Sequence, residues 1–248
     1  MQIESAIILS AGFGKRLSPL TDHTPKPLVE VGGVPVLSRV LGAIKNYGSI
    51  RHVVLNSHHL ATQIDAYMKG VGANILGDIS YDVIYEPTIL ETGGGVKNAL
   101  PLLSSTSLPF LVINGDGFLQ NGDGLHRLSQ HFDEKKMAGL LALVEKKNMV
   151  AISIKHGDFK ADAMHHGAIP IERDGGDDSL VFCGVQILTS QLFADMKGDV
   201  FSLNKIYDRA ITKMRLYGLL MAGKFFTIGT LADITLAEKN IDGVKNNG

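Results

Sequence analysis

The sequence lacks the features that would mark a disulfide-bonded, membrane-spanning or nucleic-acid-binding protein. It has one cysteine, Cys183, so no disulfide can form within the chain, which fits a reducing compartment. The formal net charge is −1, so no overall field would draw the protein to a nucleic acid or a membrane surface. No apolar run approaches the roughly 20 residues that span a bilayer, and the N-terminus lacks the basic and then apolar pattern of a signal peptide. These absences predict a cytoplasmic protein with neither a membrane nor a nucleic acid as partner.

What the sequence does contain is typical of one α/β domain. The chain has 248 residues, of which 45% are apolar and 20% charged, enough for one sizeable core. Short apolar runs alternate with stretches of helical spacing, and this order predicts a parallel sheet. We therefore expect a Rossmann-like, doubly wound, mostly parallel sheet with helices on both faces. The expected strands are 3–9, 51–56, 81–85, 109–117, 139–144, 180–188 and 224–228, and the expected helices are 37–47, 60–68, 96–103, 124–135, 206–214 and 231–241.

The chain is organised around a glycine-rich turn that follows the first expected strand. Residues 9–27 read LSAGFGKRLSPLTDHTPKP, and the small residues at the start of this stretch would let the backbone approach a ligand closely. Unpaired N–H groups in such a turn form a concavity for anions, and Lys15 and Arg16 add full charges beside it. Lys26 lies between two prolines that restrict its backbone. The stretch predicts a grip for a triphosphate.

Two better-known glycine motifs do not fit this turn. The nucleotide P-loop requires four residues between its glycines and then Lys followed by Ser or Thr, a spacing that is absent around Gly12 and Gly14. The dinucleotide fingerprint requires a third glycine where this chain has Leu17, which disfavours an NAD-dependent oxidoreductase. An ordinary connection between a strand and a helix is the remaining alternative, and the clustered cations favour ligand binding over it.

Two later loops are expected to reach the same edge of the sheet. Glu86 follows the third expected strand and ETGGG follows at residues 91–95, so a flat nucleobase could lie on bare backbone with Glu86 or Thr92 at its edge. Asp116 lies at the carboxyl end of the strand 109–117, where ligands of open α/β sheets bind. A carboxylate that faces a triphosphate needs a cation between them, and oxygen ligands with phosphates favour Mg²⁺.

The residues that carry this pattern resemble a known family. The pattern consists of Gly12-x-Gly14-x-Arg16-x-x-Pro19-Leu20-Thr21, then Pro25-Lys26-Pro27-Leu28, then Gly33-x-Pro35-Val36. It is similar to the signature of the sugar-1-phosphate nucleotidyltransferases, which make nucleoside diphosphate sugars from an NTP and a sugar 1-phosphate. The resemblance is strong over residues 3–120, moderate over 180–240 and poor over 145–179. Within the family it is greatest to the small uridylyltransferases of peptidoglycan recycling, with mannose-1-phosphate guanylyltransferases as the alternative.

The resemblance implies a reaction and a set of site residues. The sugar phosphate would attack the α-phosphorus of the NTP, with UTP favoured over GTP, and pyrophosphate would leave. Arg16 would neutralise the β and γ phosphates, Lys26 would lie near the α phosphate or the sugar phosphate, and Asp116 would hold Mg²⁺. One domain, 1–248, would comprise a nucleotide-binding half, about 1–120, and a sugar-binding half with a closing helix, about 121–248, in a monomer or small homo-oligomer. The nucleotide would be bound by Leu9, Ala11, Gly12, Gly14, Lys15, Glu86, Thr92 and Gly93, and the sugar by Asn114 and Glu172.

Two positions depart from the family pattern. Relatives carry Asp-x-Gly-Thr near the C-terminus, where the Asp gives the metal a second carboxylate, whereas this chain has Thr227 at that place. Three interpretations follow: an active enzyme with a weaker metal site, an enzyme in which Asp233 or another residue supplies the carboxylate, or a nucleotide binder that has lost catalysis. Many relatives also have Glu-Lys-Pro in the sugar region, where this chain has Glu172 and Arg173, so the role of that lysine is unassigned.

Overall fold

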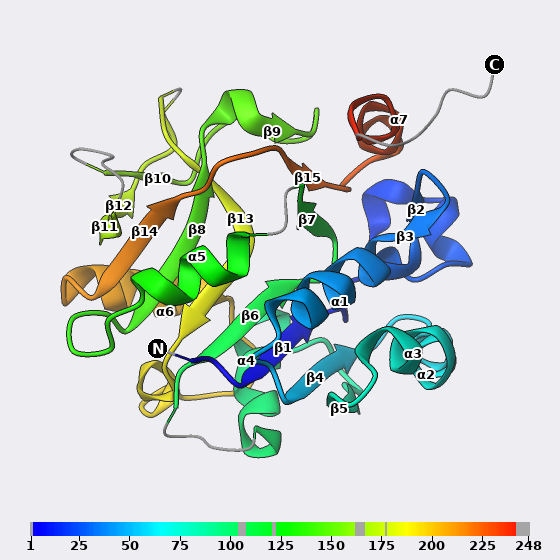
Figure 1. Ribbon diagram of the computed structural model, residues 1–248, viewed down its shortest axis with the longest axis horizontal. Coiled ribbons are helices and arrows are strands. Elements are labelled where there is room, and N and C mark those ends of the chain that lie inside the picture. The colour runs from blue at the N-terminus through cyan, green and yellow to red at the C-terminus, as the bar shows by residue number, and fades with distance from the viewer. Residues whose placement is uncertain (1, 104–107, 121–122, 162–166, 177, 242–248) are drawn as a thin grey trace.

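The computed structural model describes residues 2–103, 108–120, 123–161, 167–176 and 178–241, and its centre is an eight-stranded sheet (Figure 1). The strands are β1 (Ser5–Leu9), β4 (His52–Ser57), β5 (Ser80–Tyr85), β6 (Phe110–Asn114), β8 (Gly139–Val144), β11 (Ile169–Pro170), β13 (Val181–Leu188) and β14 (Leu216–Leu220). Their order in the sheet is β11-β14-β8-β13-β6-β1-β4-β5. The four strands β6, β1, β4 and β5 are parallel, as are β8 and β14, whereas β13 is antiparallel to both of its neighbours. The prediction of a mostly parallel sheet is confirmed.

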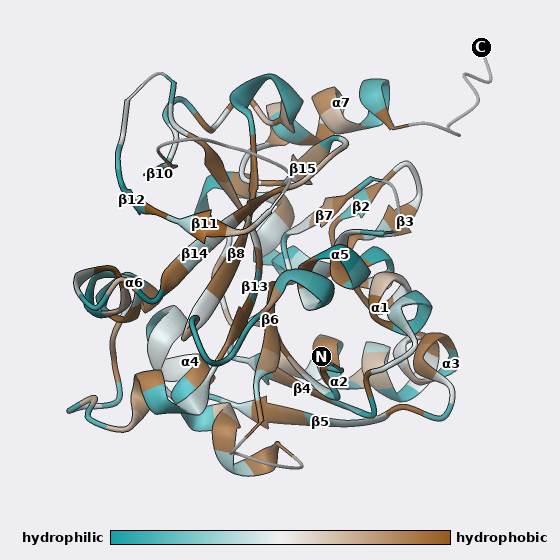
Figure 2. Ribbon diagram, turned by 60° about the vertical axis from the view of Figure 1, so that its left-hand side comes forward, coloured by the Kyte–Doolittle hydropathy of each residue, from teal (hydrophilic) through white to brown (hydrophobic). Residues whose placement is uncertain are grey.

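Helices cover both faces of the sheet, where they enclose two apolar clusters. One cluster contains side chains of α1 (Val36–Tyr47), α2 (Ala61–Tyr67), α3 (Ala73–Leu76) and α5 (Gly124–His131). The other contains side chains of α4 (Glu91–Ala99) and α6 (Leu203–Thr212). Strand β1 supplies Ile8 to one cluster and Ile7 to the other, because successive strand residues point to opposite faces. Figure 2 shows the apolar strands enclosed in this way, and the predicted doubly wound arrangement is confirmed.

Helix α1 illustrates how the apolar spacing forms these elements. Leu37, Leu41 and Ile44 recur at helical spacing, and all three side chains are buried against the sheet. Each fully buried side chain of this kind contributes roughly 1.5–3 kcal/mol. The helix ends at Gly48, which has φ +74° and donates its N–H to the carbonyl oxygen of Lys45. The helix and its C-terminal glycine agree with the sequence prediction.

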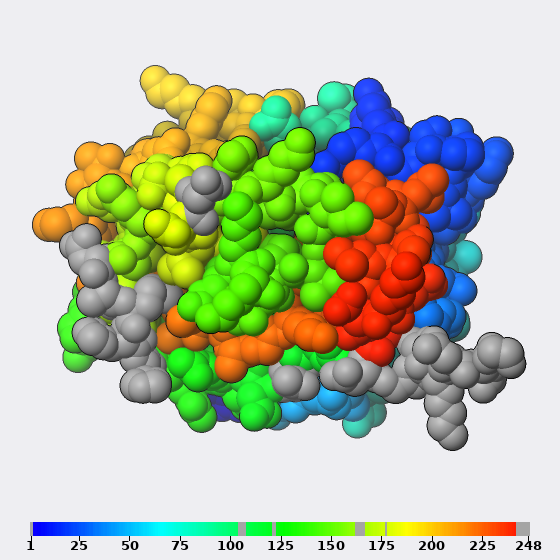
Figure 3. Space-filling model, turned by 90° about the horizontal axis from the view of Figure 1, so that it is seen from above, coloured from blue at the N-terminus to red at the C-terminus, as the bar shows by residue number. Residues whose placement is uncertain are grey.

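A smaller layer carries the turn that contains Asp116. The strands β7 (Gly117–Leu119), β15 (Phe225–Thr227) and β9 (Met149–Val150) form a three-stranded sheet, and α7 (Leu231–Asn240) packs on the same apolar cluster. Within this cluster the rings of Phe118 and Phe226 stack with their centroids 4.9 Å apart. Helix α7 also lies against the N-terminal part of the chain, where Gly32 N–H donates to Glu238 Oε1 at 3.3 Å (Figure 3). The last helix therefore holds the segment around Gly32 against the C-terminal part of the chain.

Several element boundaries differ from the sequence predictions. The predicted strand 109–117 is wrong as a single strand, because the chain turns at Gly115 and Asp116 between β6 and β7. The predicted helix 124–135 ends at His131, since Phe132 has φ −77° and ψ 123°. The weakly periodic region 145–179 contains β9, β11 and the antiparallel pair β10 (Phe159–Lys160) and β12 (Glu172–Arg173) within its described residues. Strand β14 was not predicted at all.

The lone cysteine belongs to the core of the sheet. Cys183 lies in β13 and is 1% exposed. Burial, assisted by the negative charge of Asp158, raises the pKa of its thiol well above the usual value. A thiol in this environment is a small apolar side chain and not a nucleophile. Within the described residues, no helix has the length and apolar character that a membrane span requires.

Candidate functional site

A cavity of about 360 Å³ opens where the parallel strands β1, β4, β5 and β6 end. The glycine turn after β1, the loop after β5 and the Gly115-Asp116 turn after β6 all contribute to its walls. The structure thus brings together the three loops that were expected to meet at this edge. The cavity is lined by Leu9, Ser10, Ala11, Gly12, Gly14, Lys15, Arg16, Lys26, Pro27, Asn56, Glu86, Ile89, Glu91, Thr92, Asn114, Gly115, Asp116 and Gly229.

The glycine turn is held in a conformation that requires Gly14. This residue has φ +65°, and a Cβ atom on it would lie 2.9 Å from Thr21 Cγ2 and 3.2 Å from Lys26 Cβ. The Thr21 hydroxyl donates to the carbonyl oxygen of Gly14 at 2.9 Å. Within the described part of the chain, the backbone N–H groups of Ala11, Gly12 and Phe13 have no acceptor. Such free N–H groups beside the cavity form the kind of concavity that binds phosphate oxygens.

Two cations extend from this turn in different directions. Lys15 Nζ lies 5.2 Å from the ring centroid of the exposed Phe13. Arg16 reaches the C-terminal half of the chain, since a Cβ atom on Gly229 would lie 3.2 Å from Arg16 Nη2. Arg16 and Gly229 both line the cavity. The guanidinium therefore lies between the first glycine turn and the loop that precedes α7.

Lys26 and Asp116 contact each other directly at the cavity wall. Lys26 Nζ donates to Asp116 Oδ2, and the two side chains are 14% and 30% exposed. Lys26 begins a short 3-10 turn, Lys26–Leu28, which is flanked by the buried ring of Pro25. The ammonium and the carboxylate neutralise each other when no ligand is present. Both groups remain accessible from the cavity and can exchange this contact for a ligand.

The carboxylate of Asp116 could hold a divalent metal with help from a substrate. Mg²⁺ commonly binds one or two protein carboxylates and takes its other ligands from phosphates and water. In the described residues no group of three or more His, Cys, Asp or Glu side chains could hold a metal without such help. Thr227 stands opposite Gly117 in the β15–β7 pair, and its hydroxyl donates to the carbonyl oxygen of Asp116 at 3.5 Å. The position where relatives carry a second carboxylate therefore lies next to Asp116 and is occupied by a neutral hydroxyl.

Asp233 does not supply the missing carboxylate, so the residue named first in that interpretation of the sequence is excluded. Its side chain is 0% exposed and forms a capping box with Thr230 at the start of α7. Oδ1 accepts from the N–H groups of Ile152 and Ser153 at 2.6 and 3.1 Å, and Oδ2 accepts from those of Gly229 and Thr230 at 3.0 and 2.8 Å. Burial alone would raise the pKa of Asp233, but hydrogen bonds from the side chain of Ser153, the N–H groups of Ile152 and Ser153, and the side chain of Thr230 lower it. The carboxylate is committed to holding the Gly229 loop in place.

The glycines of the ETGGG segment pack against protein, which corrects their expected role. Helix α4 begins at Glu91 and contains all three glycines, whereas the sequence predicted a helix from 96 to 103. The N–H groups of Gly93 and Gly94 donate to the carbonyl oxygen of Phe201 at 2.8 and 3.0 Å. A Cβ atom on Gly93 would lie 2.5 Å from the Phe201 ring. Gly93 is absent from the cavity lining, so this glycine allows close packing and does not expose backbone to a nucleobase.

The remaining predicted residues of this loop face the cavity. Glu86 and Thr92 both line it, and the Thr92 hydroxyl oxygen accepts from the N–H of Leu203 at 2.9 Å. Glu91 also lines the cavity with φ +59°, a left-handed conformation that is uncommon outside glycine. Such a conformation at a cavity wall is typical of ligand-binding segments.

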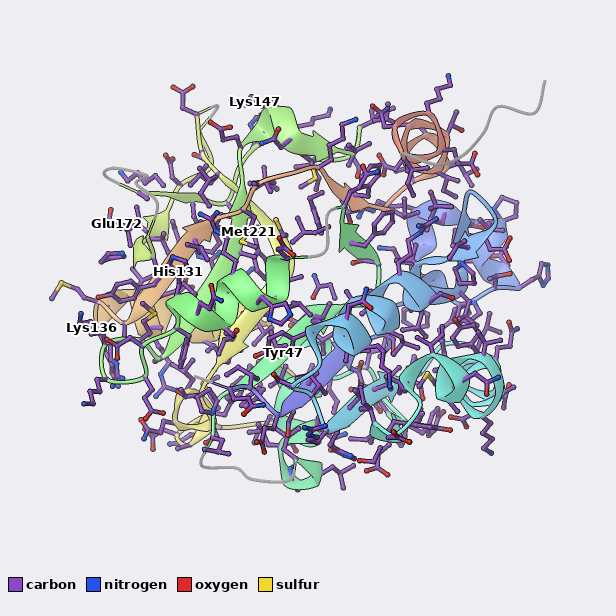
Figure 4. The ribbon with its side chains drawn as sticks, viewed as in Figure 1. Tyr47, His131, Lys136, Lys147, Glu172 and Met221 are labelled. Atoms are coloured by element: carbon purple, nitrogen blue, oxygen red, sulfur yellow. The ribbon has the colours of Figure 1, made fainter. Side chains whose placement is uncertain are left out.

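The two residues assigned to the sugar lie in different places. Asn114, at the end of β6, lines the cavity, and a Cβ atom on Gly184 would lie 2.7 Å from its Nδ2 atom. Glu172 is an exposed residue of the β10–β12 pair and is not part of the cavity lining. Figure 4 shows Glu172 on the side of the view opposite the N-terminal loops. Its neighbour Arg173 lies over the rings of Phe159 and Tyr207, where it packs against the protein.

Sequence reasoning missed several residues of the cavity. Asn56 and Ser10 hydrogen-bond each other, since Ser10 N–H donates to Asn56 Oδ1 at 2.7 Å. Ser10 belongs to the glycine-rich turn that was predicted to approach a ligand, whereas Asn56 was missed. Asn56 lies at the carboxyl end of a parallel strand, and this position was the signal that could have identified it. Gly229 is brought to the cavity from the other end of the chain, and no local pattern indicates that.

Comparison with protein families places the chain among nucleotide-transferring enzymes. The model of the nucleotidyl transferase family matches residues 5–152, more than half of the chain. The N-acetylmuramate alpha-1-phosphate uridylyltransferase of Neisseria meningitidis serogroup B is 32% identical over 245 residues, which cover 94% of this chain and 96% of that protein. The catalytic subunit beta of mannose-1-phosphate guanylyltransferase from Drosophila melanogaster is 40% identical over 111 residues, but these cover only 45% of this chain and 29% of that protein.

Solved structures share the fold at lower sequence identity. The structure of a UDP-glucose pyrophosphorylase complexed with UDP-glucose superposes with a TM-score of 0.78. The superposition covers 96% of this chain and 97% of that one, at 15% identity. This similarity extends to nearly the whole length and agrees with the resemblance noted in the sequence. The chain belongs to the nucleotidyl transferase family.

Proposed function

We propose that this protein transfers a uridylyl group from UTP to a sugar 1-phosphate and releases pyrophosphate. N-Acetylmuramate 1-phosphate is the first candidate for the acceptor, because the Neisseria uridylyltransferase is similar over 94% of this chain. The observation that carries the proposal is the contact between Lys26 and Asp116, in the wall of a cavity where the glycine turn and the loop after β5 meet. The enzyme would act in the cytoplasm in peptidoglycan recycling, as a monomer or a small homo-oligomer.

The residues of the cavity suit this reaction through positioning and charge. The free N–H groups of the turn 11–13 and the guanidinium of Arg16 can bind the phosphates that leave as pyrophosphate. Lys26 can neutralise the charge that builds up on the α phosphate and the incoming sugar phosphate. Phosphoryl transfer needs little covalent help from protein, so the alignment of the two substrates accounts for much of the rate. Asn114 lines the same cavity and would bind the sugar.

Magnesium is the proposed cofactor, because it prefers oxygen ligands such as the carboxylate of Asp116. When bound, it would offset the negative charge of the triphosphate. Asp116 would give its carboxylate to the metal and release Lys26 to the phosphates. Thr227 offers a hydroxyl near the carbonyl oxygen of Asp116, which supports a weaker metal site than one with two carboxylates.

A guanylyltransferase that uses GTP and mannose 1-phosphate is the second candidate. The 40% identity to the Drosophila subunit over 111 residues supports it. Glu86 could accept N–H groups from guanine as well as from uracil. A third candidate is a relative that binds nucleotide but has weak catalysis, and the neutral Thr227 is the observation that favours it.

A substrate panel tests the proposal directly. Purified protein with Mg²⁺ should release pyrophosphate fastest from UTP with N-acetylmuramate 1-phosphate, and more slowly from GTP with mannose 1-phosphate. The nucleoside diphosphate sugar should be identified by mass spectrometry. Release from GTP with mannose 1-phosphate alone would favour the second candidate. Binding of UTP without turnover of any sugar phosphate would favour the third.

A further inference from the structure

The carboxylate of Glu86 is held at the cavity wall as an acceptor of hydrogen bonds. The residue is 1% exposed, yet it lines the cavity. Oε1 accepts from Asn56 Nδ2 at 2.8 Å, and Oε2 accepts from the N–H of Leu90 at 3.3 Å. A carboxylate has about four acceptor positions, so these two contacts leave capacity for a ligand. Because both oxygens already receive an N–H group, the side chain presents acceptors only.

Asn56 fixes this arrangement because its own amide can point in one direction only. Ser10 N–H donates to Asn56 Oδ1 at 2.7 Å, which places the amide nitrogen on the opposite side. The nitrogen then donates to Glu86 Oε1, and a reversed amide would set an oxygen against the carboxylate and a nitrogen against an N–H group. The side chain of Asn56 therefore connects the backbone of the glycine turn to the carboxylate of Glu86 through two hydrogen bonds.

The surrounding backbone leaves this pair little freedom. Glu86 N–H donates to the carbonyl oxygen of Ser57 at 2.8 Å, and His58 Nδ1 donates to the carbonyl oxygen of Glu86 at 2.7 Å. Gly95 lies directly behind the pair, since a Cβ atom there would be 2.6 Å from Asn56 Nδ2 and 3.1 Å from Glu86 Oε1. The last glycine of the ETGGG segment thus makes room for the two side chains.

We propose that Asn56 is a positioning residue that selects the nucleobase by keeping Glu86 in its acceptor-only state. The proposal rests on the proposed nucleotidyl transfer and names a chemical class for its donor. Uracil and guanine carry an N–H at the ring nitrogen of their pairing edge and can donate to Glu86. Cytosine and adenine carry a lone pair at that nitrogen, which would face the carboxylate and repel it, and only their exocyclic amino group could then donate. A buried polar group without its partner discriminates by about tenfold or more.

The test exchanges the two functional groups of the pair. In Glu86→Gln, one of the two carboxylate oxygens becomes an NH2 group, which leaves Asn56 Nδ2 or Leu90 N–H without its acceptor and presents a donor to the cavity. In the double variant Asn56→Asp with Glu86→Gln, the new amide nitrogen donates to residue 56 and its oxygen again serves as an acceptor. We expect the single variant to lose about tenfold or more of the preference for UTP over CTP, and the double variant to recover most of it.

The preference is measured by calorimetric titration of each protein with UTP and with CTP, together with kcat/KM for both nucleotides. Glu86→Gln combined with Asn46→Asp, at an exposed position of α1, adds the same charge elsewhere and should not recover the preference. Equal binding of UTP and CTP by the wild type would overturn the proposal, as would a folded double variant that recovers none of the preference lost in Glu86→Gln. The binding readout separates this proposal from the function itself, since a protein that binds UTP selectively without turnover contradicts only the function. A structural role would lower the melting temperature without changing the ratio of the two affinities.

Discussion

The ammonium of Lys26 donates a hydrogen bond to the carboxylate of Asp116 across 90 positions of sequence. The cation that suits a phosphate and the carboxylate that suits a metal are therefore paired with each other in the nucleotide-free protein. A metal alone must displace Lys26, and a triphosphate alone must leave Asp116 without a counter-charge. We expect a complex of Mg²⁺ with the nucleotide to supply both missing partners at once, and therefore expect the metal and the nucleotide to bind together.

The first prediction concerns metal affinity without nucleotide. Lys26→Met removes the ammonium that competes for Asp116, so the affinity of the nucleotide-free protein for Mn²⁺ should rise by up to about fivefold, which corresponds to the roughly 1 kcal/mol of a partly exposed ion pair. Electron paramagnetic resonance of free Mn²⁺ measures this affinity. Unchanged or weaker binding in the variant would show that the pair does not hold the metal back.

The second prediction concerns turnover. Lys26→Ala should lower kcat by about 100-fold or more, because it removes a charge that would stabilise the transition state. The circular dichroism spectrum should stay unchanged, since the side chain lies at the cavity wall and not in the core. Lys69→Ala, which removes an exposed lysine far from the cavity lining, is the matched control. Near-normal pyrophosphate release by the Lys26 variant would remove this residue from the reaction.

The third prediction tests the position beside Asp116. Thr227→Asp places a second carboxylate there, and the rate at limiting Mg²⁺ should rise by up to about tenfold. Thr227→Asn has a similar shape without the charge and should give no such rise. The measurement is the Mg²⁺ concentration at half-maximal rate for each variant. If both variants behave alike, the neutral hydroxyl does not weaken the metal site.

The fourth prediction compares Gly14, where a side chain would be strained, with Gly42, where a side chain has room. Gly14→Ala forces an alanine to φ +65° and against Thr21, so the free energy of unfolding should fall by roughly 1–2 kcal/mol or more. Gly42→Ala, in the middle of α1, meets no atom within 4 Å and should raise it by about 0.5–1 kcal/mol. Urea unfolding measures both changes. A stable Gly14 variant would mean that the turn can adopt another conformation.

The fifth prediction follows from the lowered pKa of Asp233. The ordinary pKa of its carboxyl group is 3.8, and the folded protein holds it lower. The contribution of this carboxylate is therefore complete above about pH 4 and disappears as the pH falls through the folded pKa. Asp233→Asn should lower the free energy of unfolding at pH 7 by about 1–3 kcal/mol, because buried N–H groups lose an acceptor. It should also flatten the acid limb of the stability profile, and an acid limb identical to that of the wild type would contradict this role.

Those parts of the fold with strong local patterns could be predicted from the sequence. The strands β1 and β4 and the helix α1 have continuous or periodic apolar residues, and their order implies a parallel sheet. The parallel direction then places the residues after each strand at one edge, which is how Glu86 and Asp116 could be assigned to one site. The antiparallel direction of β13 could not be predicted, because it depends on which distant strands it pairs with.

The parts of the site that depend on distant contacts were beyond sequence reasoning. Asn56 could have been placed at the carboxyl end of its strand, but its hydrogen-bond partners could not be predicted, since they lie 46 positions before it and 30 after it. Gly93 was interpreted as a ligand contact because glycine permits close approach, yet the group that approaches is Phe201. Asp233 resembled a metal ligand in sequence, and only the hydrogen bonds to its two oxygens identify it as a helix cap.

The contact between Phe201 and helix α4 has a consequence for the autonomy of the two halves. The carbonyl oxygen of Phe201 accepts the N–H groups of Gly93 and Gly94 in the first turn of that helix. In return, Lys97 Nζ donates to the carbonyl oxygen of Gly198 at 2.9 Å. A fragment that stops near residue 120 would lose these hydrogen bonds to residues 198–201. It would also leave one edge of β6 without its neighbouring strand β13. We infer that neither half is a self-sufficient folding module, and that the chain gains or loses its structure as a single cooperative unit.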